Sequence, residues 1–193
     1  MKHKLTTHNP QPTTNHGYTL FELLIVVAIL ALLATASLYA GMRQVERAKI
    51  AQAMKQVNDI KAAATIYRSD TGSMPPTYRR VGSPPPPTTD NPFTNQLVNV
   101  INWRGPYLQP YPETHPWKGN IGWLNGVGNV YYIVLDDDRS GMSDSDNRGL
   151  ISLFAMQEID RIYDDNNLTT GRITGNGANG TALGELMIYI GQN

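Results

Sequence analysis

A run of twenty residues without a formal charge, residues 23–42, constrains this 193-residue chain more than any other feature. The run is rich in Leu, Ile, Val and Ala, and a helix of this length extends roughly 30 Å, the thickness of the hydrocarbon core of a bilayer. We therefore expect residues 18–42 to form a transmembrane helix and the residues after it to form one compact domain.

A polar leader precedes the apolar run. Residues 1–17 contain Lys2 and Lys4 but no acid, and they end in Gly17. A Sec signal peptide has its apolar region before the cleavage site, where it is lost, whereas a cut after Gly17 keeps the apolar run. The lysines favour a cytoplasmic amino terminus, although the three basic residues within 43–49 weaken this orientation signal.

Glu22 places a carboxylate at the start of the apolar run, where an unpaired charge is costly to bury. One explanation is that Glu22 lies at the headgroup level and interacts with the positive end of the helix macrodipole. The other requires cleavage after Gly17, which gives Tyr18 a free amine four residues before Glu22. The carboxylate would then pair with this amine in its own chain or in a neighbouring one.

The segment GYTLFELLIVV, residues 17–27, resembles the processing site of type IV pilins and type II secretion pseudopilins. In that family a glycine is usually followed by Phe, then by T-L-x-E and an apolar helix. The resemblance implies that a prepilin peptidase cuts between Gly17 and Tyr18 and methylates the new amine, and that Glu22 acts in assembly. The chain departs from the family in having Tyr18, a long leader and no proline near the middle of the helix.

The helix is predicted to continue beyond the membrane. No proline occurs between Tyr18 and Met74, and apolar side chains recur there at spacings of three and four. These side chains belong to Ile50, Ala53, Met54, Val57, Ile60, Ala64 and Tyr67. We expect a helix from Tyr18 to about Arg68, with the amphipathic part, residues 43–72, packed against a sheet.

Residues 73–193 are expected to form a loop-rich head with a small antiparallel sheet. Together with the long helix this gives an α+β fold, like that of the pilin family. Strand signals lie at residues 121–124, 130–135, 151–154 and 183–190. The first two flank the turn sequence NGVGN and predict a hairpin. Residues 156–163 are ambiguous and also fit a short helix, and residues 171–180 are expected to form a loop.

Residues 103–120 are similar to a passage of major pseudopilins, but His115 stands where that family usually has Asp. No second His or Cys lies at a useful spacing, so we expect His115 to be a loop residue and not a metal ligand or a base. The chain contains no cysteine, which excludes a disulfide, a zinc-thiolate site and a thiol nucleophile.

An acidic segment, residues 136–147, follows the predicted hairpin. It begins with the D-x-D-x-S-G pattern of calcium loops and has an acid at the ninth position, but Asn147 replaces the bidentate Glu of the twelfth. Major pseudopilins resemble this region and have an Asp-rich calcium loop there. We expect a calcium site, against the alternative of a solvated acidic turn. The candidate ligands are Asp136, Asp138, Ser140, Asp144 and Asp146.

The charges are distributed unevenly, although the net charge is zero. From Arg43 to Arg68 there are six basic residues and two acids, whereas residues 136–193 contain four basic residues and ten acids. We interpret this as packing of a basic stem against the acidic head of another copy, because the basic stretch also carries an apolar stripe that must be buried. Asp164 and Asp165 lie in a segment that is similar to a segment of other pilin-like proteins. We expect these two acids to contribute to the same contact between copies.

No catalytic triad, metal-hydrolase motif or nucleotide-binding motif is present, and the resemblance implies a structural protein and not an enzyme. It implies a type II secretion pseudopilin of the bacterial inner membrane, with a periplasmic head, that polymerises into a pseudopilus driving protein export. The implied partners are further copies, minor pilins or pseudopilins, the prepilin peptidase and the inner-membrane assembly platform. The alternative is a type IV pilin, major or minor, for adhesion, motility or DNA uptake. The head has few basic residues for nucleic acid.

Overall fold

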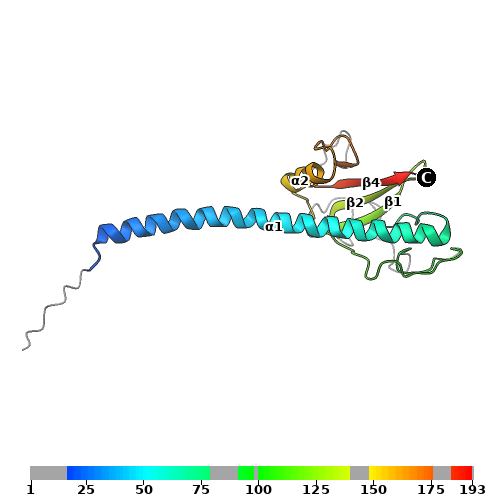
Figure 1. Ribbon diagram of the computed structural model, residues 1–193, viewed down its shortest axis with the longest axis horizontal. Helices are drawn as coiled ribbons and strands as arrows, with labels where there is room; N and C mark the ends of the chain where they lie inside the picture. Colours follow the sequence, from blue (N-terminus) through cyan, green and yellow to red (C-terminus); the bar gives the residue numbers. More distant parts are fainter. Residues whose placement is uncertain (1–16, 79–90, 98–99, 140–147, 176–183, 193) are drawn as a thin grey trace, which may run out of the picture. The chain divides into compact units, whose positions relative to one another are not determined.

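The computed structural model describes residues 17–78, 91–97, 100–139, 148–175 and 184–192, without the side chains of residues 38–40 and 139. The chain divides into two compact units, Met1–Arg43 and Gln44–Asn193. Helix α1 (Leu20–Thr71) contributes to both units, and the other described helix and strands lie in the second unit (Figure 1). The predicted long helix is therefore confirmed, with its ends shifted by two or three residues.

The described part of the first unit consists of a short extended segment and the first half of α1. The apolar side chains of this half are exposed, for example Leu20 at 82% and Leu32 at 70%. An 18-residue window of the helix has a mean hydropathy of 2.6, and none of the window is buried by protein. By length and composition the helix can cross a membrane, as predicted.

Helix α1 ends at a glycine. Gly72 adopts a φ of +79°, and its N–H donates to the carbonyl oxygen of Arg68 at 2.9 Å. This left-handed conformation closes the last helical turn at little steric cost because glycine has no Cβ. Two prolines follow at positions 75 and 76, which cannot continue the helix.

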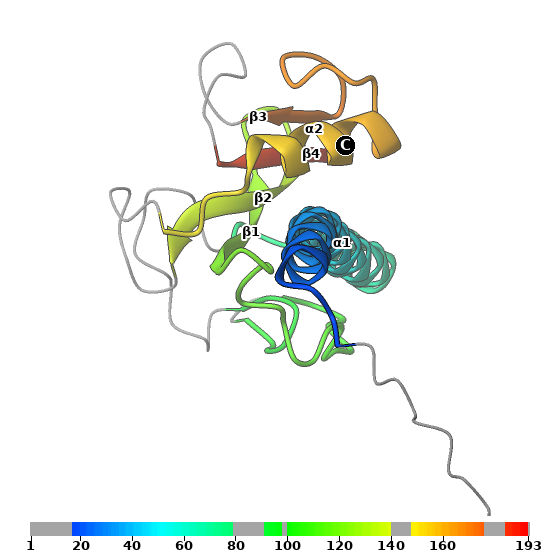
Figure 2. The same ribbon diagram turned by 90° about the vertical axis from the view of Figure 1, so that its left-hand side faces the viewer.

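The second unit contains a four-stranded antiparallel sheet. In spatial order its strands are β1 (Gly119–Asn125), β2 (Val130–Arg139), β4 (Leu186–Gln192) and β3 (Ile173–Gly175). The predicted hairpin is β1 and β2, so the prediction of an α+β fold with an antiparallel sheet is confirmed. Figure 2 shows helix α2 (Leu153–Tyr163) on one side of α1 and the segment before β1 on the other.

The apolar stripe of the second half of α1 is buried in the core of the head, as predicted. Ala53, Ile60 and Ala64 are completely buried, and the alanines let the rest of the core approach the helix backbone closely. The core includes Trp123 of β1, which is also completely buried and whose Nε1–H donates to the carbonyl oxygen of Pro75 at 3.0 Å. Strand β1 thus holds the segment that follows the end of α1.

Two expectations for the head are wrong. Residues 151–154 do not form a strand, because Ser152 caps α2 and the residues after it are helical. The expected loop at 171–180 contains strand β3, whose three residues pair with β4. The ambiguous residues 156–163 belong to α2, where Ala155, Met156 and Ile159 form the buried face at helical spacing. The last strand is confirmed in the described residues 186–192.

Candidate functional site

The predicted processing site lies immediately before α1. Gly17 and Tyr18 are both exposed, Tyr18 at 82%, and neither is part of the helix. The bond between them is therefore not covered by any described part of the chain. The leader before Gly17 lies outside the described residues.

Glu22 forms a capping box with Thr19 at the start of α1. The N–H and the Oγ1–H of Thr19 donate to Oε2 of Glu22 at 2.8 and 2.9 Å, and the N–H of Glu22 donates to Oγ1 of Thr19 at 3.2 Å. This reciprocal pair satisfies backbone N–H groups that have no partner within the helix. The carboxylate thus has a local role in capping the start of α1.

The acidic segment begins inside strand β2 and not in a loop. Between consecutive pairs of the ladder, β1 advances by two residues, from Gly119 to Ile121, while β2 advances by four. Three residues of β2, Asp136, Asp137 and Asp138, therefore lie opposite the single residue Asn120 of β1, and we call these three the acidic bulge. Neighbouring side chains of a regular strand point to opposite faces, and a bulge breaks this alternation. One oxygen of each carboxylate therefore lies within 4.8 Å of the others, and all three residues are at most 9% exposed.

Groups outside the ladder hold the backbone of the acidic bulge. The Nδ1 atom of His115 accepts from the N–H of Trp117 at 3.3 Å, so the proton resides on Nε2, which donates to the carbonyl oxygen of Asp136 at 2.7 Å. The N–H of Gly149 donates to the carbonyl oxygen of Asp137 at 2.6 Å. His115 is thus a structural residue of a loop, as predicted, and its hydrogen bond to Asp136 links that loop to the acidic bulge.

Two glycines allow this close approach. A Cβ atom at Gly119 would overlap the carbonyl oxygen of Asp136 and the imidazole of His115. A Cβ atom at Gly149 would overlap the backbone of Gly119. The acidic bulge, the strand beside it and the segment after residue 147 are therefore packed backbone to backbone.

Burial of the acidic bulge disfavours negative charge. The pKa of Asp136 is raised to about 6, chiefly by burial and also by the charges of Asp138 and Asp137. Hydrogen bonds with the Asp138 backbone and the Glu185 side chain act in the opposite direction. Burial also lowers the pKa of His115 to about 4, against the effect of its bond to the backbone of Asp136, so the ring is neutral near pH 7.

Glu185 is a fourth buried acid that the sequence analysis did not associate with this site. It is 9% exposed and immediately precedes Leu186, which pairs with Leu135 next to the acidic bulge. Only the strand pairing brings it there, since 49 residues separate it from Asp136. Among the predicted ligands, the structure brings Asp136 and Asp138 together, while Ser140, Asp144 and Asp146 lie outside the described residues.

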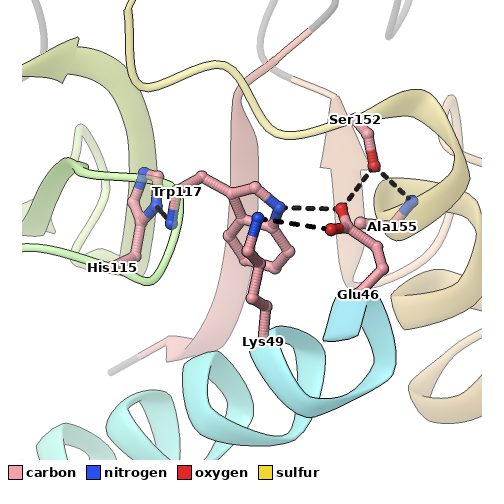
Figure 3. A network of polar contacts seen from close by, with 6 residues as sticks. All are labelled: Glu46, Lys49, His115, Trp117, Ser152 and Ala155. Atoms are coloured by element: carbon pink, nitrogen blue, oxygen red, sulfur yellow. Dashed lines mark hydrogen bonds and ion pairs between the residues drawn. The ribbon is translucent and has the colours of Figure 1, made fainter. Parts of the chain in front are cut away.

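A second polar network joins the stem to the head (Figure 3). Oε1 of Glu46, on α1, accepts from Nε1–H of Trp117 at 2.8 Å and from the hydroxyl of Ser152 at 2.6 Å, and Nζ of Lys49 lies 3.5 Å from Oε2. The Ser152 hydroxyl also accepts from the N–H of Ala155 and so caps α2. Partial burial alone would raise the pKa of Glu46, but the bonds from Ser152 and Trp117 and the charge of Lys49 lower it overall.

The amino-acid sequence of the chain is similar to those of several known proteins. The prokaryotic N-terminal methylation motif matches residues 13–38. The chain is 29% identical to the type II secretion system core protein G of Pseudomonas aeruginosa over 135 residues, 67% of this chain and 89% of that protein. It is 34% identical to the type IV major pilin protein PilE1 of Neisseria gonorrhoeae over 76 residues, 39% of this chain and 46% of that protein.

Among solved structures, the major type IV pilin PilA1 from Clostridium difficile is similar, with a TM-score of 0.47 and 16% sequence identity. The match covers 76% of this chain and 97% of that one. The chain thus carries a prokaryotic N-terminal methylation motif, and its sequence is similar to that of a type II secretion core protein and of a type IV major pilin.

Proposed function

We propose that the chain is a structural, non-enzymatic subunit of a type IV filament-like assembly, and that this assembly is the periplasmic pseudopilus of a type II secretion system. The observation that carries the proposal is the combination of the methylation motif with an apolar half-helix that the described part of the chain leaves uncovered. Such a surface must be covered by lipid before assembly and by other subunits after it. The similarity to core protein G, which extends over 89% of that protein, favours the secretion system over a pilus.

In this proposal a prepilin peptidase of the inner membrane removes residues 1–17 and methylates the amine of Tyr18. The head then lies in the periplasm, consistent with Lys2 and Lys4 in the leader. Glu22 pairs with the amine of a neighbouring subunit during assembly, because a charge-assisted bond offsets the cost of placing both groups among apolar helices. The partners are further copies of the chain, minor pseudopilins and the inner-membrane assembly platform.

A strain that lacks the gene tests the choice of machine. We expect loss of exported enzyme activity from the medium, with surface filaments unchanged in electron micrographs. Loss of surface pili with intact export would instead support a type IV pilin for adhesion, motility or DNA uptake. The 34% identity to a gonococcal major pilin favours that second candidate, although the chain spans less than half of that pilin.

The variant Glu22→Ala tests the subunit contact. We expect the variant to reach the membrane at the normal level, because the apolar run is unchanged, but to be absent from sheared or overexpressed filaments. Thr19→Ala is the matched control, since it removes the local capping partner of Glu22 and leaves the carboxylate. Normal assembly of Glu22→Ala would show that the carboxylate serves only to cap α1.

We also propose that the acidic bulge binds calcium, with Asp136 and Asp138 as ligands and Ser140, Asp144 and Asp146 as further ligands outside the described residues. Three buried carboxylates within 4.8 Å of one another, beside the buried Glu185, supply the hard oxygen donors that calcium takes. When bound, the ion supplies that charge and holds the acidic segment in one conformation.

Titration of calcium into the chelated full-length protein in detergent tests this site. We expect binding heat and a rise in melting temperature, both reduced in Asp138→Asn. The exposed stem acid Asp59, which pairs with Lys55, provides the control variant Asp59→Asn. If calcium produces neither heat nor a shift in melting temperature, the proposal is wrong.

A further inference from the structure

A second group of carboxylates lies where α2 ends and the chain turns towards β3. Asp160 is on the buried face of α2, and Asp164 and Asp165 follow the helix directly. One oxygen of each carboxylate lies within 4.8 Å of the others. We call these three residues the Asp160 cluster. For Asp164 and Asp165 the sequence predicts only a contact with another copy.

One oxygen in this cluster has no partner. Asp160 is 1% exposed, and its Oδ1 atom is buried without a hydrogen-bond partner in the described structure. If the carboxyl is ionised, a buried anion lies next to two other anions. If the proton is on Oδ2, Oδ1 still accepts no hydrogen bond from the described residues. Both states leave a buried polar atom unsatisfied, at a cost that a directly bound cation removes.

The surrounding loop holds the other two carboxylates in place. Oδ2 of Asp164 accepts from the backbone N–H groups of Arg172 and Ile173, and Asp165 accepts from the N–H of Asn167 and the hydroxyl of Thr170. These bonds connect the end of α2 to the start of β3. The two carboxylates are thus positioned before any ion binds, which reduces the entropy lost on binding.

The nearby arginines are directed to other groups. Arg161 forms two parallel hydrogen bonds with Glu158, both at 2.9 Å, and the guanidinium carbon of Arg172 lies 6.0 Å from the ring centre of Tyr189. Asp160 also borders an open hollow of about 560 Å³ between α2 and the loop. The cluster therefore lies next to a space that solvent ions can enter.

Gly171 is required for the loop to fold over the cluster. It adopts a φ of +81°, and a Cβ atom there would overlap the carboxylate of Asp164. The left-handed backbone brings the N–H groups of the next two residues onto Asp164. Any other residue at this position would push the loop away from the acids.

We propose that Asp160, Asp164 and Asp165 form a second calcium site of the head, distinct from the acidic bulge. Calcium suits the cluster because it accepts carboxylate oxygens in irregular geometry and completes its coordination with carbonyl groups and water, whereas magnesium requires a near-octahedral arrangement. The bound ion links α2 to the loop that leads into β3. This inference does not depend on which filament the chain enters.

Calcium titration of the chelated full-length protein in detergent, by calorimetry and by melting temperature, tests the inference. We expect a site with a dissociation constant on the order of 10⁻⁴ to 10⁻³ M, as in extracellular calcium modules. Asp160→Asn should bind one ion fewer than the wild type or bind it at least tenfold more weakly. Magnesium should bind more weakly than calcium, and equal binding would overturn the assignment to calcium.

Glu158→Gln is the matched control, because it removes a charge from the same hollow without touching the cluster, and it should bind calcium like the wild type. Asp165→Asn provides a second variant at an exposed position in case Asp160→Asn does not fold. Asp138→Asn distinguishes the two sites, since it should lose only the ion of the acidic bulge. Wild-type stoichiometry and affinity in both Asp160→Asn and Asp165→Asn would overturn this proposal and leave the other one standing.

Discussion

Replacing Glu46 should loosen the head from its stem. In the variant Glu46→Ala, Nε1 of Trp117 and the hydroxyl of Ser152 lose their common acceptor. Glu46→Gln is the more conservative change, because an amide oxygen in the position of Oε1 can still accept both bonds. The two variants therefore separate the effect of the hydrogen bonds from that of the charge.

The size of the effect follows from burial. A hydrogen bond to a charged group contributes about 1.5–3 kcal/mol, but the side chain of Glu46 is 18% exposed and Ser152 can bond to water. Trp117 is only 8% exposed, so its N–H remains poorly solvated. We expect Glu46→Ala to lower the free energy of unfolding by about 2–3 kcal/mol and Glu46→Gln by about 1 kcal/mol.

For a unit of this size, 1 kcal/mol corresponds to roughly 2–4 °C in melting temperature, so Glu46→Ala should melt roughly 4–12 °C lower. Near-ultraviolet circular dichroism follows the tryptophans of the head and is insensitive to the helix in detergent. Asp59→Ala is the control: it removes another acid of α1, whose side chain is 41% exposed in its pair with Lys55, and should cost no more than about 0.5 kcal/mol. If Glu46→Ala were no more destabilising than Asp59→Ala, the network would have no role in holding the head.

Three further outcomes are expected from the contacts of Ser152, Gly119 and Glu46. Ser152→Ala should cost about 1–2 kcal/mol in thermal melts, because it removes the N-cap of α2; an unchanged melting temperature would contradict this. Gly119→Ala should destabilise by about 2–4 kcal/mol, because its Cβ overlaps the acidic bulge, whereas Gly191→Ala, with no atom within 4 Å of the added Cβ, should be nearly neutral. The pKa of Glu46 lies below its ordinary value of 4.5 in the folded chain, so its contribution is present above that pH and is lost as the pH falls through the lowered pKa. The difference in melting temperature between wild type and Glu46→Gln should therefore shrink in acid, and a constant difference down to the lowest pH at which the protein folds would count against the assignment.

The parts of the fold that were predicted correctly depend on local patterns. The apolar run and the stripe at spacings of three and four define α1, and the turn sequence between two apolar segments defines the hairpin. The strand expected at 151–154 was wrong because a short, mostly apolar segment fits either state, and Ser152 as an N-cap was the signal that was missed. Strand β3 has only three residues and no pattern of its own.

The candidate site was only partly predictable for a different reason. Asp136 and Asp138 were identified from the alternation of a calcium loop, but in the structure they lie in a bulge that also turns Asp137 towards them. The bulge depends on the register of two strands, and Glu185 depends on a third strand. Neither the register of the strands nor the position of Glu185 can be inferred from the residues around position 136. The sequence of that segment alone therefore does not predict that the four acids come together.

The positions of the two acidic groups indicate where a bound cation would act on the fold. Each lies where regular structure ends: the acidic bulge at the end of the β2 ladder, and the Asp160 cluster between the last turn of α2 and β3. Strand β3 is held by β4 through three residue pairs, and the chain has no cysteine with which to fix this edge. An ion that binds Asp160 on the helix and Asp164 on the loop fixes the edge at a single point, so chelation should raise amide exchange first in β3 and in the loop before it. The hairpin of β1 and β2, which is anchored by Trp123 in the core, should exchange more slowly in both states.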